Sequence, residues 1–175
     1  LVGLGAIGKE VALRLVPFGC QVYYHKPHRL PEPNPWQVIY SELDELLTTC
    51  DIVSLHLPVT PDSINIINSQ TIEKMKDGAI LINTSRGELV DQNAVCQALK
   101  SGKLGGFGAD TLAPEPVQPD NPIINVPEEL RNRVALSPHI GGITAGTFHR
   151  SYRRAIENMK KALNGERPDH VVNSL

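Results

Sequence analysis

The chain has 175 residues, 41% of them hydrophobic and 21% charged, and its formal net charge at pH 7 is −2. This length and hydrophobic content are enough to bury one good core, so we expect a single domain that spans residues 1–175. The small net charge and the lack of a long basic run argue against a nucleic-acid-binding protein. No segment has the length of a membrane span and no signal peptide is recognisable, so we expect a cytoplasmic protein.

The three cysteines, Cys20, Cys50 and Cys96, are an odd number and lack the spacing of a metal site. Each lies in an apolar sequence context, which is typical of buried thiols. We therefore expect buried, reduced cysteines and no metal centre.

The chain opens on the glycine-rich motif GLGAIG, residues 3–8. In such a motif Gly3 permits a tight turn out of a strand, Gly5 lets the backbone approach a pyrophosphate, and Gly8 lets the next helix pack against the strand. The first N–H groups of that helix would point at the phosphates. One side of the predicted helix is apolar and carries Val11, Ala12, Leu15 and Phe18.

After this helix the sequence predicts a strand over residues 21–24 and then a loop. The loop covers the proline-rich residues 27–35, because proline fixes its backbone angle and lacks the N–H of regular structure. Ser41 and Asp44 resemble a capping box at the start of a helix that runs through Leu47.

The next elements are a strand over residues 51–57, a helix near residues 71–75 and a short strand over residues 79–82. A helix follows, for which Asp91 is a suitable N-terminal cap and Gly102 a suitable stop. Strands and helices therefore alternate through the middle of the chain.

Two further strands, residues 105–109 and 134–136, and a closing helix complete the chain. The closing helix has one apolar stripe, which is more typical of a packing helix than of a partner-binding one, and Gly165 predicts its end. Strands that alternate with helices predict a Rossmann-type doubly wound parallel sheet with helices on both faces. The stripe consists of Phe148, Tyr152, Ala155, Ile156, Met159 and Leu163.

Four residues with useful chemistry lie beyond predicted strands. Arg86, Asp110 and His139 each follow a strand, and ligands of open α/β sheets bind beyond the carboxyl ends of the strands. His139 is suited to donate a proton near neutral pH, and Glu115 can hydrogen-bond its other ring nitrogen and raise its pKa. Arg86 can hold a carboxylate and a keto oxygen with its planar fork. Together these residues could bind an acid and transfer a proton.

Each of these residues also has a simpler interpretation. Arginine and aspartate are most often surface charges, and an isolated histidine is more often structural than catalytic. His56, within the apolar strand that ends at Leu57, is interpreted as structural.

Five motifs in order resemble the cofactor-binding domain of the D-isomer-specific 2-hydroxyacid dehydrogenases. This family includes phosphoglycerate dehydrogenase, hydroxypyruvate/glyoxylate reductase and D-lactate dehydrogenase, and the resemblance covers nearly all of the chain. The motifs are GLGAIG (3–8), LHLPVTP (55–61), NTSRGELVD (83–91), GADTLAPEP (108–116) and SPHIGGIT (137–144).

The resemblance implies an oxidoreductase domain that transfers a hydride between a nicotinamide cofactor and a 2-keto or D-2-hydroxy acid. It implies that Arg86, Glu115 and His139 are the catalytic residues. Asp110 matches the acidic residue that fixes the nicotinamide carboxamide, and Leu57 a position that contacts the cofactor through its backbone. The implied cofactor contacts are Gly3, Gly5, Ala6, Ile7, Gly8, Leu57, Pro58, Thr84, Ser85, Arg86, Asp110, His139 and Gly142.

One position departs from the family pattern. Relatives that use NAD place an aspartate at the end of the second strand to bind the adenosine ribose. Here that position is Lys26, and His25, His28 and Arg29 are close to it in sequence. A basic cluster favours a 2′-phosphate, so we expect Lys26 to bind the cofactor and NADP to be preferred over NAD. The alternatives are an exposed basic loop without a ligand, and a loss of the aspartate that reflects only loose NAD binding.

The resemblance also bears on organisation. Relatives carry a preceding segment that forms most of a separate substrate domain, whose last piece returns after a sequence like Val171–Asn173 here. We therefore expect residues 1–175 to be the dinucleotide-binding domain, with the substrate domain largely outside the chain. By resemblance we expect a homodimer.

Two other functions remain open. A transcriptional corepressor of the same fold would sense dinucleotide and bind protein while retaining the same residues. Formate dehydrogenase looks similar around residues 28–31, but it pairs its histidine with glutamine, whereas this chain has Glu115. The identity of the 2-keto acid cannot be read from this chain.

Overall fold

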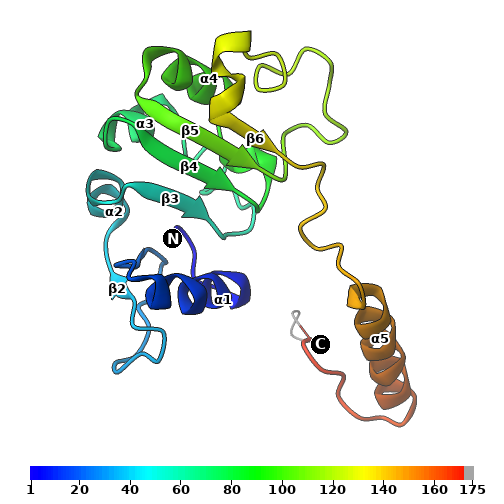
Figure 1. The fold of residues 1–175 in the computed structure, drawn as a ribbon. Coiled ribbons are helices and arrows are strands. Elements are labelled where there is room, and N and C mark those ends of the chain that lie inside the picture. Colours follow the sequence, from blue (N-terminus) through cyan, green and yellow to red (C-terminus); the bar gives the residue numbers. More distant parts are fainter. Residues whose placement is uncertain (172–175) are drawn as a thin grey trace. The chain divides into compact units, whose positions relative to one another are not determined.

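A computed structural model describes residues 1–171, and its main feature is a parallel sheet of four strands. The strands lie side by side in chain order: β3 (Ile52–Leu55), β4 (Ala79–Asn83), β5 (Leu104–Ala109) and β6 (Val134–Leu136). They run in one direction, so their carboxyl ends meet along one edge (Figure 1). This edge is where parallel sheets place their ligands.

A second, two-stranded parallel sheet pairs β1 (Tyr23–Tyr24) with β2 (Ile39–Tyr40). Val2 joins the two sheets, because it forms parallel bridges to both His25 and Leu55. The strand order is therefore β2, β1, Val2, β3, β4, β5, β6. Successive strands are added first on one side of Val2 and then on the other, as in the Rossmann order, while all strands stay parallel. The predicted fold class is confirmed.

Four α-helices connect these strands: α1 (Ala6–Leu15), α2 (Leu43–Thr49), α3 (Ser69–Lys74) and α4 (Gln92–Ser101). Three 3₁₀ helices lie between them or follow them: η1 (Val16–Phe18), η2 (Gly87–Leu89) and η3 (Glu128–Arg133). The helices pack into two core clusters. The larger cluster joins α2, α3 and α4 to β3–β6, and the smaller joins α1 to β1 and the segments beside it.

Alternation along the strands explains the larger cluster. Val53 and Leu81 point to the helix-covered face and are fully buried, whereas their neighbours Ile52 and Ile80 point to the other face and are 58% and 39% exposed. Successive side chains of a strand point to opposite faces, so each strand has one buried face and one more exposed face.

Several local predictions are confirmed. The side chain of Asp91 accepts hydrogen bonds from the N–H groups of Asn93 and Ala94 at the start of α4. Gly102 ends the same helix with a left-handed φ of 81°. Both residues act as the sequence predicted.

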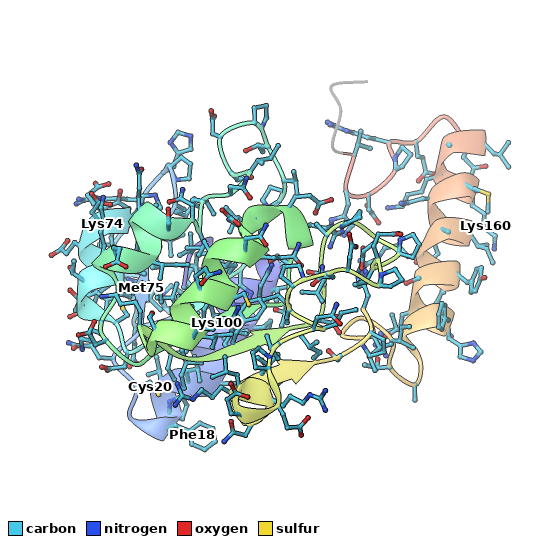
Figure 2. The ribbon with its side chains drawn as sticks, turned by 90° about the horizontal axis from the view of Figure 1, so that it is seen from above. Phe18, Cys20, Lys74, Met75, Lys100 and Lys160 are labelled. Carbon is cyan, nitrogen blue, oxygen red and sulfur yellow. The ribbon has the colours of Figure 1, made fainter. Side chains whose placement is uncertain are left out.

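Three local predictions are wrong. Ser41 does not form a capping box with Asp44, because its hydroxyl donates instead to the carboxylate of Glu45 and the carbonyl of Glu42. Phe18 is 85% exposed, since α1 ends at Leu15 before it. Of the three cysteines expected to be buried, Cys96 is buried, Cys50 is half-buried and Cys20 is exposed. The side chains of Phe18 and Cys20 lie at the outside in Figure 2. A capping box does occur at α3, between Asn68 and Thr71.

The described residues divide into two compact units, one from Leu1 to Pro138 and one that begins at His139. The second unit contains α5 (Thr147–Leu163), whose predicted apolar stripe is largely exposed. After α5 the chain folds back against this helix, and the carboxylate of Asp169 accepts a hydrogen bond from Lys161. The expected single domain through residue 175 stays a prediction, and the Val-Asn pair at 172–173 lies outside the described residues.

Candidate functional site

The glycine-rich motif packs against the start of the loop after β3. A Cβ atom on Gly3, whose φ is 93°, would overlap the carbonyl of His56. A Cβ on Gly8 would lie 2.9 Å from the carbonyl oxygen of Gly3. Gly5 differs, because a Cβ there would have no described neighbour within 4 Å. Gly3 and Gly8 are therefore required by packing, whereas Gly5 leaves open space on the exposed side.

The N-terminus of α1 has no protein cap. Its N-cap residue, Gly5, has no side chain, and its first turn contains no acidic residue. By contrast, Asp91 caps α4, Asn68 caps α3, and the first turn of α2 contains two acidic residues. Unpaired N–H groups at a helix start favour an anion. The motif thus fits the pyrophosphate of a dinucleotide, with Ala6, Ile7 and Gly8 supplying the N–H groups.

Arg86 lies in the turn that follows β4. Its guanidinium is exposed, and one Nη donates to the carbonyl of Ser85 at 2.7 Å. The hydroxyl of Ser85 donates to the carbonyl of Leu55 at the end of β3, also at 2.7 Å. Thr84 is exposed, and Leu57 and Pro58 follow β3 at the same edge of the sheet. The turn is thus tied to the neighbouring strand while the cation of Arg86 faces solvent.

Asp110 follows β5 and is 7% exposed. Its N–H donates to the carbonyl of Asn83, and its Oδ1 accepts a hydrogen bond of 2.5 Å from the hydroxyl of Ser137. A carboxylate that accepts a hydrogen bond from a hydroxyl is held in one orientation. Ser137 was not among the residues that the sequence singled out. Its position one strand away from Asp110 becomes visible only when the register of β5 and β6 is known.

Glu115 lies in the irregular segment between β5 and η3, and it is exposed. Two amides anchor this segment to α4. Gln92 donates to the carbonyl of Ala113 at 2.7 Å, and the buried Asn121 donates to Gln92 Oε1 at 2.8 Å. The backbone two residues before Glu115 is therefore fixed.

His139 is the first residue of the second unit, and Gly142 lies in the same unit. The backbone of His139 has a φ of 53°, in the left-handed region that residues other than glycine seldom adopt. Such residues gather at functional sites. Arg86, Asp110 and Glu115 belong to the first unit, so their placement relative to His139 stays a prediction.

The basic cluster lies between β1 and β2. The guanidinium of Arg29 stacks over the ring of Tyr40, with its central carbon 4.0 Å from the ring centre. His25 is within 3.1 Å of the carbonyl of Ser41 through Nδ1. Lys26 follows His25 directly and is half-buried, and His28 is exposed. The loop thus holds at least one cation in a defined position.

His56 directly follows β3, and its carbonyl packs against Gly3. Its Nε2 is 2.9 Å from the hydroxyl of Ser54, and burial lowers its pKa to about 4. A neutral, half-buried histidine that bonds its own strand fits the structural interpretation.

A cavity of about 800 Å³ lies elsewhere, beside the start of α4. None of the site residues expected from the sequence lines it. Its lining includes the carboxylates of Glu88, Asp91 and Asp120, a set that would repel an anionic cofactor.

Residues 1–171 show neither a metal-binding cluster nor a membrane-spanning helix. These residues contain no group of three or more His, Cys, Asp or Glu side chains that could hold a metal ion. No described helix is long and apolar enough to cross a membrane.

Comparison with known proteins adds to this geometry. Residues 1–141 match the family model described as D-isomer specific 2-hydroxyacid dehydrogenase, NAD binding domain. The chain is 38% identical over 174 residues to a glyoxylate reductase of Korarchaeum cryptofilum, covering 99% of this chain and 51% of that protein. The chain thus spans about half the length of the curated relatives it matches.

Two solved structures are similar over almost the whole chain. The TT0316 protein of Thermus thermophilus is 41% identical, with a TM-score of 0.84, and the match covers 98% of this chain and 52% of that one. The D-mandelate dehydrogenase of Rhodotorula graminis is 31% identical, with a TM-score of 0.89, and the match covers 99% and 50%.

We expect an added methyl group to have different effects at Gly3 and at Gly5 of the motif. Gly3→Ala will destabilise the fold by about 3 kcal/mol, because the new Cβ overlaps the His56 carbonyl and the backbone has a positive φ. Gly5→Ala will leave stability nearly unchanged but weaken dinucleotide binding by about tenfold or more, since its Cβ enters the open side. Urea unfolding and calorimetric titration with NAD measure the two effects. Wild-type affinity in Gly5→Ala would place the ligand elsewhere.

His56 predicts a pH dependence of stability. Its pKa is about 4 in the folded chain, below the 6.5 of an exposed histidine, so the unfolded chain binds an extra proton between these values. This contribution is absent above pH 6.5, and it lowers the free energy of unfolding progressively as the pH falls from 6.5 to 4. In the variant His56→Gln, the free energy of unfolding will no longer fall with pH between 6.5 and 4 on account of this residue. Parallel pH profiles for the two proteins in urea unfolding would contradict the assignment.

Proposed function

This chain belongs to the D-isomer specific 2-hydroxyacid dehydrogenase family, and from that premise we propose that the protein interconverts 2-keto acids and D-2-hydroxy acids with a nicotinamide dinucleotide. The observation that carries the proposal is the shared carboxyl edge of the sheet. The uncapped start of α1, the cation of Arg86 and the buried carboxylate of Asp110 all lie beyond strand ends on this edge.

The residues divide the chemistry as follows. The dinucleotide, when bound, supplies or accepts the hydride. Arg86 binds the carboxylate and polarises the keto oxygen through its planar fork. We propose that His139 donates a proton to that oxygen and that Glu115 orients its imidazole. Asp110 orients the carboxamide and so selects the ring face that meets the substrate.

We further propose that a substrate domain from outside residues 1–175 completes the cleft. The chain spans about half the length of its curated relatives, which supports this division. This domain would form the other wall of the cleft, exclude water from the reacting groups and determine which 2-keto acid binds. The proposal also includes a homodimer in the cytoplasm, and size-exclusion chromatography with light scattering tests the dimer.

Formate dehydrogenase remains the alternative within the same fold, because its similarity extends to residues 28–31. Glu115 supports a keto-acid reductase instead, since formate dehydrogenase has glutamine in that role. A dinucleotide-sensing corepressor would bind cofactor without rapid turnover. Assays of the full-length protein with glyoxylate, hydroxypyruvate and formate separate these three functions.

For the cofactor we propose that NADP(H) is preferred over NAD(H). The family is an NAD-binding one, so this preference would be a departure by this chain. It is supported by Lys26, which directly follows His25, just after the end of β1, where His25 pairs with Val2. It is also supported by the guanidinium of Arg29, which stacks over the ring of Tyr40. Two cations at this place favour the doubly charged 2′-phosphate.

The catalytic assignment predicts two different defects in the full-length protein. His139→Ala will lower kcat by about two to four orders of magnitude, because the proton donor is lost. Arg86→Lys will mainly raise the KM for the keto acid, because lysine cannot form the planar fork. His149→Ala, an exposed histidine on α5, is the matched control and should turn over glyoxylate normally. Near-normal turnover in both test variants would refute the assignment.

The cofactor preference predicts a charge-dependent switch. At low salt the wild-type protein will bind NADPH about tenfold more tightly than NADH, and Lys26→Asp will reverse the order, because a carboxylate repels the 2′-phosphate and accepts the ribose hydroxyls. The advantage will shrink at high salt, since the contacts face solvent. Lys100→Asp makes the same charge change on α4 and should leave the ratio unaltered (Figure 2). Tighter NADH binding by the wild type at both salt concentrations would show that the basic cluster is a solvated loop without a role in cofactor choice.

A further inference from the structure

Asn83, the last residue of β4, uses both ends of its amide in the turn that carries Arg86. It is 1% exposed. Its Oδ1 accepts a hydrogen bond of 3.1 Å from the N–H of Ser85, and its Nδ2 donates to the carbonyl of Arg86 at 2.8 Å. One side chain therefore holds an N–H and a carbonyl of the turn at the same time.

This double role restricts the choice of residue. Among short side chains, an amide provides an acceptor and a donor on one rigid group, whereas a carboxylate only accepts. An aspartate at position 83 would keep the bond from Ser85 but place a second oxygen against the carbonyl of Arg86. A hydroxyl is shorter and could serve only one partner well.

The turn is also tied to the strands on both sides. The Ser85 hydroxyl bonds Leu55 at the end of β3, and the Asn83 carbonyl accepts the N–H of Asp110 after β5. Gly87 packs so closely that a Cβ there would overlap the backbone of Leu112 and Ala113. The turn of Arg86 and the segment before Glu115 therefore share one rigid contact.

We propose that Asn83 is a positioning residue for Arg86, and that its amide sets the direction in which the guanidinium meets the substrate carboxylate. The inference rests on the proposed function of Arg86 as the carboxylate-binding cation. Asn83 itself touches neither substrate nor cofactor. It acts by fixing the peptide group of Arg86, from which the side chain extends.

The first test is Asn83→Asp in the full-length protein, with glyoxylate as substrate. The KM for glyoxylate should rise about tenfold or more, because the Arg86 carbonyl loses its donor and faces a carboxylate. The dissociation constant for the dinucleotide should rise much less than this KM, since the N–H groups at the start of α1 are untouched. Asn68→Asp is the matched control, because Asn68 also donates through Nδ2 to a backbone carbonyl and accepts through Oδ1, at the start of α3. It should leave the KM unchanged.

A double-mutant cycle with Arg86→Lys then separates positioning from general stability. If Asn83 acts through Arg86, the two substitutions will be strongly non-additive in kcat/KM, with the double variant little worse than Arg86→Lys alone. Additive losses, or an equal loss of dinucleotide affinity, would overturn the inference. Should Asn83→Asp not fold, Asn83→Ser is measured by the same cycle with the same criteria.

The cycle also distinguishes this inference from the proposed function. If Arg86→Lys alone leaves the kcat/KM for glyoxylate and hydroxypyruvate unchanged, the role of Arg86 is wrong and the inference falls with it. If Arg86→Lys is defective but Asn83→Asp has a normal KM, only the inference about Asn83 is refuted.

Discussion

The first three residues share backbone hydrogen bonds with the strands on both of their sides, and the geometry of the site depends on this double pairing. The N–H of Val2 donates to Ser54, and the carbonyl of Leu1 accepts from His25. The pairing brings Gly3 against the carbonyl of His56, where a side chain would not fit. Because the chain must turn sharply at this point, α1 begins at the carboxyl edge, with its N–H groups pointing away from the strands.

Backbone groups and buried amides, more than ion pairs, hold the candidate site in place. The surface ion pairs of the first unit, such as Lys76 with Asp51 and Lys103 with Asp77, lie at the opposite ends of the strands and are exposed on their acidic side. Exposed pairs of this kind contribute little to stability. Buried amides such as Asn83 and Asn121, in contrast, satisfy two backbone groups each, and losing one would leave those groups unpaired.

The sequence was most informative where one residue type has one local use. Glycine motifs, the Asp91 cap and the Gly102 stop depend on nearby backbone, so their roles could be predicted from spacing. The Ser41 prediction failed because a serine hydroxyl has several possible partners and burial decided among them. The roles of Asn83 and Ser137 could not be predicted, since they depend on the path of a turn and on strand register. Where His139 lies relative to the first unit is a question of tertiary placement, which short motifs do not encode.

The missing cap of α1 links cofactor supply to the stability of the protein. The N-cap of α1 is Gly5, so this helix lacks the hydrogen bond of a side-chain cap, at a cost of roughly a few tenths of a kcal/mol relative to a serine or aspartate cap. An anion bound at this position would provide the absent partner, and a ligand at one hundred times its dissociation constant stabilises a fold by about 2.7 kcal/mol. The pool of dinucleotide in the cell would then set the lifetime of the folded domain as well as its activity. A protein made in excess of its cofactor would be the form most exposed to proteolysis.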